Sequence, residues 1–216
     1  MADFTVGLDL LGKRRTLRFP DMYMASNFMG HLRAPLLELD DRPLRIVDVG
    51  ACVGGWTLAH LAVLPLATFD CFEPNPAAWP YFRVNTEWCK RVTLHKLAVS
   101  DHSGYVPMAA DPDNMGKHSV ATQGAPLPAR RLDDVITGPV DLLKIDAEGH
   151  EMRVLAGALA ILDDCRPLVL VEVLKSQMER GGWTEHDLVR FMVAHGYGGP
   201  KPVSGNDWLF TPKGRA

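Results

Sequence analysis

The stretch Val47-Asp48-Val49-Gly50-Ala51-Cys52-Val53-Gly54-Gly55-Trp56 decides the fold of this chain. The run that leads into it, Leu44–Val49, is apolar and β-branched, which is typical of a parallel strand buried on both faces. Gly50 permits backbone torsions that other residues resist and lets the chain approach a ligand closely. The helix that begins at Gly54–Thr57 presents free N–H groups. The stretch therefore predicts a strand–turn–helix unit with a ligand site at the turn.

Strands and helices alternate along the rest of the chain, which predicts an α/β, Rossmann-like, doubly wound and mostly parallel sheet of about seven strands. Residues 1–216 are expected to form one domain, with an N-terminal helical segment at 1–43 and the core at 44–216. Residues 100–131 are rich in Pro and Gly and predict a long loop with one short strand near Tyr105–Met108. The expected helices are Thr57–Leu66, Ala77–Trp88, Glu151–Leu162 and Thr184–His195. Thr184, with Asp187 three residues later, resembles a capping start for the last of these. The further expected strands are Thr68–Phe72, Val92–Val99, Val140–Ile145, Pro167–Val173 and Trp208–Phe210.

Composition excludes several classes of protein. The formal net charge is -3, from 23 Lys+Arg and 26 Asp+Glu, which argues against a general nucleic-acid binder. None of the 4 cysteines forms a CxxC pair, which favours buried thiols in a reduced, cytoplasmic protein. No stretch reaches the length of apolar sequence that a membrane span requires, so no membrane association is expected.

Two carboxylates and a glycine turn predict a nucleoside cofactor. Cys52 occupies the second glycine position of the dinucleotide fingerprint G-x-G-x-x-G, so the motif is D-x-G-x-x-x-G, the form seen in S-adenosylmethionine enzymes. Glu73 ends the second strand, where a carboxylate accepts hydrogen bonds from both ribose hydroxyls. Asn75 is placed to brace the same loop. These residues alone do not separate S-adenosylmethionine from NAD.

Four further runs, taken with the glycine turn, resemble the FkbM-type methyltransferases. They are Phe72-Glu73-Pro74-Asn75-Pro76, Ala98-Val99-Ser100-Asp101, Leu132-Asp133-Asp134 and Lys144-Ile145-Asp146-Ala147-Glu148-Gly149-His150-Glu151. The last of these is the most specific, and Leu170-Val171-Glu172-Val173 fits the same pattern. The resemblance covers roughly Ile46 to Val173, and the first 40 residues add nothing to it.

The resemblance implies a class I methyltransferase fold, S-adenosyl-L-methionine as cofactor, and O-methylation of a sugar, polyketide or similar hydroxyl in natural-product biosynthesis. It places Ala98–Asp101 near the adenine and Asp146 near the reactive methyl group. The loop Asn114–Ser119 is implied to lie close to the site. The implied cofactor-binding residues are Asp48, Gly50, Ala51, Gly54, Glu73, Pro74, Asn75, Ala98, Ser100 and Asp146.

The catalytic residues are predicted from the chemistry of methyl transfer. A hydroxyl is a poor nucleophile near neutral pH, so alignment must be supplemented by a general base or a metal. We predict catalytic roles for Asp146, His150 and Glu172. His150 has the pKa best suited to a base and Asp146 ends its strand nearest the methyl group, so either is a candidate. Replacement of either by Ala is expected to lower turnover by about 10² while cofactor binding persists.

Other interpretations of this acidic cluster stay open. Asp146, Glu148, His150 and Glu172 have the ligand types of a Mg²⁺ or Mn²⁺ site, although a divalent metal is not favoured and no metal site is assigned. Structurally, Glu148 and Glu151 suit the positive start of the following helix.

The partner predicted for the site is a small-molecule hydroxylated acceptor, with no nucleic acid. A homodimer is possible. The acceptor pocket is expected to come from Tyr23–Phe28, Asp111–Pro128 and the end of the chain. Lys144 interrupts an apolar strand and is expected to pair with Asp48, Glu172 or Asp141. The remaining alternatives are N-methylation, a non-catalytic nucleoside-binding protein and an NAD(P)-dependent oxidoreductase.

Overall fold

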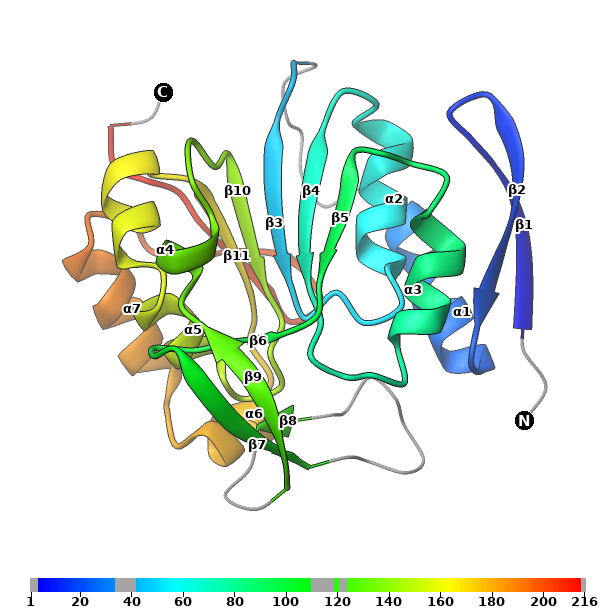
Figure 1. The fold of residues 1–216 in the computed structure, drawn as a ribbon. Coiled ribbons are helices and arrows are strands. Elements are labelled where there is room, and N and C mark those ends of the chain that lie inside the picture. The colour runs from blue at the N-terminus through cyan, green and yellow to red at the C-terminus, as the bar shows by residue number, and fades with distance from the viewer. Residues whose placement is uncertain (1–3, 34–41, 110–118, 121–123, 215–216) are drawn as a thin grey trace.

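A seven-stranded sheet forms the centre of the molecule, in the order β12-β13-β11-β10-β3-β4-β5 (Figure 1). This computed structural model describes residues 4–33, 42–109, 119–120 and 124–214. The five strands from β11 to β5 are parallel, and the C-terminal hairpin adds two antiparallel strands at one edge. The predicted doubly wound, mostly parallel sheet is therefore confirmed. The strands are β3 (Arg45–Val49), β4 (Thr68–Phe72), β5 (Val92–His95), β10 (Leu142–Ile145), β11 (Leu168–Glu172), β12 (Lys201–Ser204) and β13 (Asp207–Phe210).

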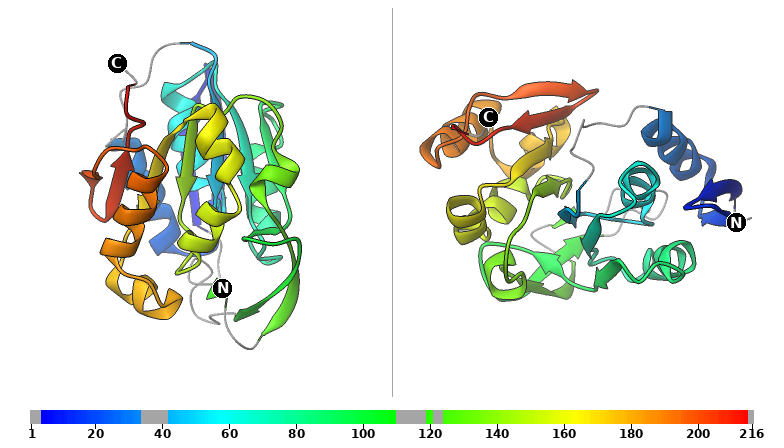
Figure 2. Two further views of the ribbon diagram at one scale, coloured as in Figure 1. Left: turned by 90° about the vertical axis from the view of Figure 1, so that its left-hand side faces the viewer. Right: turned by 90° about the horizontal axis from the view of Figure 1, so that it is seen from above.

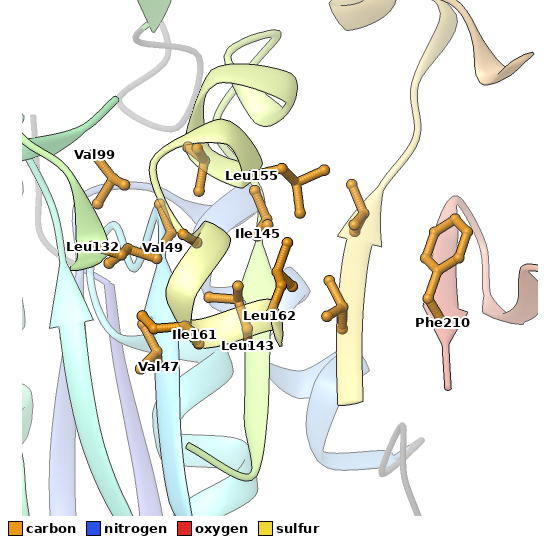
Figure 3. Packing of buried hydrophobic residues seen from close by; sticks show 14 of the residues in the cluster. Val47, Val49, Val99, Leu132, Leu143, Ile145, Leu155, Ile161, Leu162 and Phe210 are labelled. Carbon is orange, nitrogen blue, oxygen red and sulfur yellow. The ribbon is translucent and has the colours of Figure 1, made fainter. Parts of the chain in front are cut away.

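Helices cover both faces of this sheet (Figure 2). Successive residues of a strand point to opposite faces, so Val47 and Leu143 pack on one side while Ile46 and Leu142 pack on the other. Figure 3 shows the first of these cores, where side chains of β3 and β10 meet Leu155 and the helices around it. That face is covered by α4 (Leu132–Val135), α5 (Glu151–Ala156), a π-helical turn (Ile161–Cys165) and α7 (Glu185–Ala194). The opposite face is covered by α2 (Gly55–Val63) and α3 (Trp79–Thr86).

The N-terminal segment differs from the prediction of a helical segment over residues 1–43. It begins with a hairpin of β1 (Phe4–Leu10) and β2 (Lys13–Phe19), and only α1 (Met22–Arg33) is helical among its described residues. Leu17 and Phe19 alternate with exposed residues and pack against α1 and α2. Basic residues occupy both faces of β2, with Arg15 partly buried on the face of Leu17 and Phe19 and stacked over Trp88, so they mask this short period-two pattern in the sequence.

A second, four-stranded sheet takes up most of the described part of the long loop predicted over residues 100–131, and β7 contains the short strand predicted near Tyr105–Met108. Its order is β6-β9-β7-β8. Pro107 pairs with Pro126, and Pro128 pairs with Tyr105, so all three prolines occupy alternate pairs of the β7–β9 ladder. The pairs between them are free to carry the hydrogen bonds of an antiparallel ladder. The strands are β6 (Ala98–Val99), β7 (Gly104–Ala109), β8 (Ser119–Val120) and β9 (Ala125–Arg130).

Three smaller differences concern helices. The helix predicted over Glu151–Leu162 stops at Ala156. At the next residue, Gly157, the backbone passes so close to the segment after β6 that a Cβ would lie 2.1 Å from the carbonyl oxygen of Ser100. The predicted strand Val92–Val99 is divided between β5 and β6, and α6 (Lys175–Gly181) was not predicted. The predicted capping start of α7 at Thr184 is confirmed as a reciprocal capping box.

Candidate active site

A cavity of about 410 Å³ lies at the carboxyl ends of the parallel strands, the lower edge of the main sheet in Figure 1. Strand order reverses between β3 and β10, and ligands of open α/β sheets bind at such a switch point. The main sheet contributes residues at the ends of β3, β4, β5, β10 and β11 to one wall of the cavity. Helices α1 and α6, the start of α2 and Met108 of β7 also line it. Within the described part of the chain, no helix is long and apolar enough to span a membrane.

The glycine turn after β3 is shaped by two close approaches. Gly50 has a φ of 79°, and a Cβ at this position would lie 1.7 Å from the carbonyl oxygen of Asp146. The N–H groups of Gly50 and Ala51 both donate to the carbonyl oxygen of Phe72, at 3.0 and 3.1 Å. These contacts fix the turn between the ends of β10 and β4. Gly50 and Ala51 line the cavity, whereas Gly54 is the left-handed N-cap of α2 just behind it.

A buried ion pair lies beneath the turn. Lys144 and Asp48 are register partners on adjacent strands, so both side chains point to the face covered by α2. Lys144 Nζ lies 3.1 Å from Asp48 Oδ1, and Thr57 Oγ1 donates to Asp48 Oδ2 at 2.6 Å. Burial lowers the pKa of Lys144, but the charges of Asp48 and Asp146 outweigh it and hold this pKa well above its usual value. The predicted pairing of Lys144 with Asp48 is confirmed, whereas Asp141 pairs with Arg42.

Glu73 presents a buried carboxylate to the cavity at the end of β4. Its Oε1 accepts from the N–H of Asn75 at 2.7 Å and its Oε2 from the N–H of Cys52 at 2.8 Å. Burial raises the pKa of Glu73 to about 7, against the opposing effect of these two N–H groups. Each carboxylate oxygen has a second lone pair, so the group retains two acceptor positions. Pro74 lines the cavity, and Asn75 is buried behind it, where its side chain accepts from the N–H of Ala77.

Asp146 and Glu172 form an acidic pair at the ends of β10 and β11, and both line the cavity. Lys144 Nζ lies 3.3 Å from Asp146 Oδ2. Burial raises the pKa of Glu172 to about 9, assisted by the charge of Asp146 and a hydrogen bond with it. Gln177 Nε2 donates to Glu172 Oε2 at 2.6 Å. Glu172 therefore holds a proton at neutral pH, and Lys144 places a positive charge beside Asp146.

His150 lies away from this pair, on the side of the cavity formed by Ala98 and Val99. Its Nε2 is 3.0 Å from Ser100 Oγ, which in turn donates to Asp101 Oδ1 at 3.1 Å. Burial and the nearby Arg153 lower the pKa of His150 to about 4, so its ring is neutral at pH 7. Ser100 is fully buried, and it contacts His150 from behind the cavity wall.

The two other acids of this segment hold its backbone. Glu151 Oε1 accepts from the N–H groups of Ala147 and Gly149, at 3.0 and 2.9 Å, and so closes the turn between β10 and α5. Glu148 is 3.3 Å from a guanidinium nitrogen of Arg180. Among the described residues, no group of three His, Cys, Asp or Glu is arranged to hold a metal ion.

The opposite wall contains residues that sequence reasoning missed. Tyr23, Asn27 and His31 of α1 line the cavity at a spacing of four residues, which places them on one face of the helix. Part of this wall was predicted, since the pocket was expected to include Tyr23–Phe28. The four-residue spacing that begins with Tyr23 and Asn27 is the sequence signal that would have indicated His31 as a further residue of this wall. The predicted loop at Asp111–Pro128 lies mostly outside the described residues, and α6 rather than the end of the chain completes the wall with Ser176 and Arg180.

Taken together, these features define the class of protein. The sheet is Rossmann-like, the turn after β3 is rich in glycine, and an acid ends the neighbouring strand β4. The parallel strands are followed by an antiparallel C-terminal hairpin, and the cavity opens at the switch point. This is the class I methyltransferase fold.

Comparison with known proteins gives the family. The methyltransferase FkbM domain model matches residues 48–198, so the chain belongs to the FkbM methyltransferase family. It is 29% identical over 155 residues to the 2-O-methyltransferase NoeI of Sinorhizobium fredii (strain NBRC 101917 / NGR234), a match that covers 61% of this chain and 63% of that relative.

Two solved structures show the same fold at low sequence identity. Methyltransferase FkbM from Methylobacillus flagellatus KT has a TM-score of 0.61 at 19% identity, over 83% of this chain and 46% of that one. The complex of M. jannaschii TYW2 with AdoMet has a TM-score of 0.52 at 11% identity, over 97% of this chain and 84% of that one.

Proposed function

We propose that this protein is an S-adenosylmethionine-dependent O-methyltransferase that acts on a hydroxyl group of a small molecule. The observation that carries the proposal is the carboxylate of Glu73, which is fixed by two backbone N–H groups and faces the cavity beside the glycine turn. Membership of the FkbM family and the likeness to a 2-O-methyltransferase support the same reaction class.

The cavity fits the proposed cofactor in size and in chemistry. Its volume of about 410 Å³ falls in the range of sites that enclose a small ligand. The free lone pairs of Glu73 suit a ribose diol, and the anionic Asp146 suits a positive sulfonium. S-Adenosylmethionine, when bound, supplies a methyl group on a good leaving group. We assign the ribose to Glu73 and Pro74, and the adenine to Ala98 and His150, whose ring is held from behind by Ser100.

The chain's own residues then have to hold and orient the acceptor. We assign Asp146 to accept the hydrogen bond of the acceptor hydroxyl, because it lines the cavity at the end of β10. Lys144 and the protonated Glu172 both lie beside Asp146 and hold its carboxylate in place, so that it can orient the hydroxyl. Glu172 acts as the donor that fixes Asp146 in place. Enclosure of the acceptor in this cavity aligns it for in-line displacement.

Calorimetric titration with S-adenosylhomocysteine, beside NAD⁺, tests the cofactor assignment. We expect micromolar binding of S-adenosylhomocysteine alone. Glu73→Ala should weaken it by about 10²-fold, because two hydrogen bonds to a charged group are lost. Glu87→Ala is the matched control, since this exposed glutamate at the end of α3 lies outside the cavity. Preference for NAD⁺, or binding of neither ligand, would contradict the proposal.

Transfer of a labelled methyl group tests the acceptor class. The protein would be incubated with S-[methyl-¹⁴C]adenosylmethionine and a panel of methyl glycosides, linear polyols and phenols, each matched with an amine analogue. Label in the hydroxyl compounds supports O-methylation. Label confined to the amines would instead support N-methylation.

A further inference from the structure

Helix α1 brings a histidine into the cavity from outside the residues that the family model matches. His31 lies in the last turn of α1, and the family match covers residues 48–198. Phe28 packs its Cβ within 3.7 Å of the position that a Cβ on Gly55 would occupy, so α1 is seated directly on the start of α2. This contact holds His31 at the cavity wall, in line with Asn27 and Tyr23.

His31 makes no hydrogen bond to any described residue, although its ring is partly buried. A neutral histidine ring carries one N–H donor and one nitrogen lone pair. Most polar side chains in a protein interior have partners, so a partly buried ring that lacks them at a cavity wall has its donor and its lone pair available to a ligand. The contrast with His150 is direct, because Nε2 of that ring is already bonded to Ser100.

The charges around His31 suit a group that gains a proton only during the reaction. Burial lowers the pKa of His31 and the charge of Lys144 lowers it further, whereas Asp146 and Asp48 act in the opposite direction. The ring is therefore neutral at pH 7, and the carboxylates of Asp146 and Asp48 stabilise the imidazolium once it forms. His60 lies behind it, stacked on Trp56 with ring centroids 3.8 Å apart. Burial lowers the pKa of His60 to about 4, so it adds no charge.

We propose that His31 is the general base that takes the proton of the acceptor hydroxyl. As the methyl carbon bonds to the acceptor oxygen, its bond to sulfur breaks and the electron pair stays on sulfur. The O–H bond breaks at the same oxygen, and its proton moves to the free nitrogen of His31. The imidazolium then returns the proton to solvent. This assignment rests on the proposed function, and it leaves Asp146 to orient the hydroxyl.

Other groups of the cavity are less suited to this step. Glu172 already holds a proton at neutral pH, Asp146 is paired with Lys144 at 3.3 Å, and Nε2 of His150 is hydrogen-bonded to Ser100. His31 combines a neutral ring, no hydrogen bond to a described residue, and the neighbouring charges of Asp146 and Asp48, whereas the ring of His150 is held by Ser100.

Histidine titration by NMR tests the placement of His31 without any acceptor. The ¹³Cε1–¹H signals of the wild-type protein would be followed against pH with S-adenosylmethionine and, separately, with S-adenosylhomocysteine; His31→Asn assigns the signal. A base beside the transferred methyl group feels the sulfonium charge. The proton affinity of His31 should therefore be about tenfold lower with S-adenosylmethionine than with S-adenosylhomocysteine. His102 and His186, both exposed, are the controls and should not respond.

A second measurement tests proton transfer itself. With the best hydroxyl acceptor of the panel, His31→Asn should lower turnover by about 10²-fold and remove the acidic limb of the pH–rate profile, while calorimetry shows unchanged S-adenosylhomocysteine binding. With amine acceptors in their neutral form, the turnover of this variant should fall far less, because the attacking nitrogen needs no base. If both ligands bind but His31 titrates identically with each, or if the variant turns over normally, His31 is not the base. If neither ligand binds or shifts any signal, the proposed function fails and this assignment fails with it.

Discussion

The two walls of the cavity differ in how their polar groups are satisfied. On the wall built by the sheet, Glu73 and Lys144 each have protein partners within 3.1 Å, the partner of Lys144 being Asp48 beneath the wall. On the wall built by α1, Asn27 and His31 make no hydrogen bond to any described residue. The first wall belongs to the segment that the family model matches, and the second precedes it.

This difference shows what each wall does for binding. Groups held by internal partners keep their positions before a ligand arrives, which suits recognition of a constant cofactor. Groups without internal partners gain their hydrogen bonds from the ligand, which suits a variable acceptor. The comparison predicts that substitutions on the sheet wall cost stability as well as function, whereas those on the α1 wall spare stability.

The largest effect is expected from Lys144→Met. It leaves Asp48 as a buried carboxylate without its counter-charge, which should lower the free energy of unfolding by about 3–5 kcal/mol in urea denaturation. Lys175→Met is the matched control, because its exposed pair with Glu179 contributes under about 1 kcal/mol. Equal losses in the two variants would remove the distinction between a structural ion pair and a surface one.

Asp146→Asn tests the residue that we place beside both the sulfonium of the cofactor and the hydroxyl of the acceptor. Loss of the oriented acceptor contact should reduce turnover by about 10²-fold with the best hydroxyl acceptor of the panel. S-Adenosylhomocysteine carries no sulfonium charge, so its affinity should stay within about threefold, while that of S-adenosylmethionine falls further. The exposed Asp164→Asn serves as control. A parallel loss of both affinities would mean that Asp146 maintains the fold of the site instead.

The affinity for S-adenosylhomocysteine should depend on pH through Glu73. Its pKa in the free protein is about 7, and hydroxyl donors favour the ionised form. Binding is therefore full above this pKa and is lost as the pH falls through it, by about tenfold between pH 8 and pH 6. Calorimetry at several pH values measures this slope. Glu73→Gln cannot ionise and should bind weakly at every pH; an unchanged slope would assign the titration to another group.

The smallest effect is expected from Asn27→Ala on the α1 wall. Since Asn27 has no described partner, the free energy of unfolding should change by less than about 0.5 kcal/mol. Asn85→Ala is the matched comparison, because this buried amide bonds to backbone groups of Arg18 and Val53. That variant should lose at least about 2 kcal/mol, since the backbone groups are left without partners. Similar losses in both would show that α1 depends on Asn27 for its packing.

Elements that depend on a short stretch of sequence were predicted correctly. The strand Thr68–Phe72 was predicted with its observed bounds, and the capping box at Thr184 was found from two residues three apart. The hairpin before α1 was missed because its apolar alternation is short and basic residues lie on both faces of β2. The strand predicted near Tyr105–Met108 lies within β7, but its pairing with β9 was missed because three prolines argue against paired strands unless their register is known.

The sequence by itself determined the alternating α/β fold, the glycine turn, and the acids at the ends of the strands, because each depends on periodicity or on one local conformation. Only the tertiary structure decided the partners of those acids. The register of β3 and β10 brought Lys144 beside Asp48. Burial keeps Glu172 protonated, so that it donates a hydrogen bond, and keeps the ring of His150 neutral beside Ser100. The seating of α1 on α2 placed His31 at the cavity, since a contact across the chain depends on packing that no local pattern records.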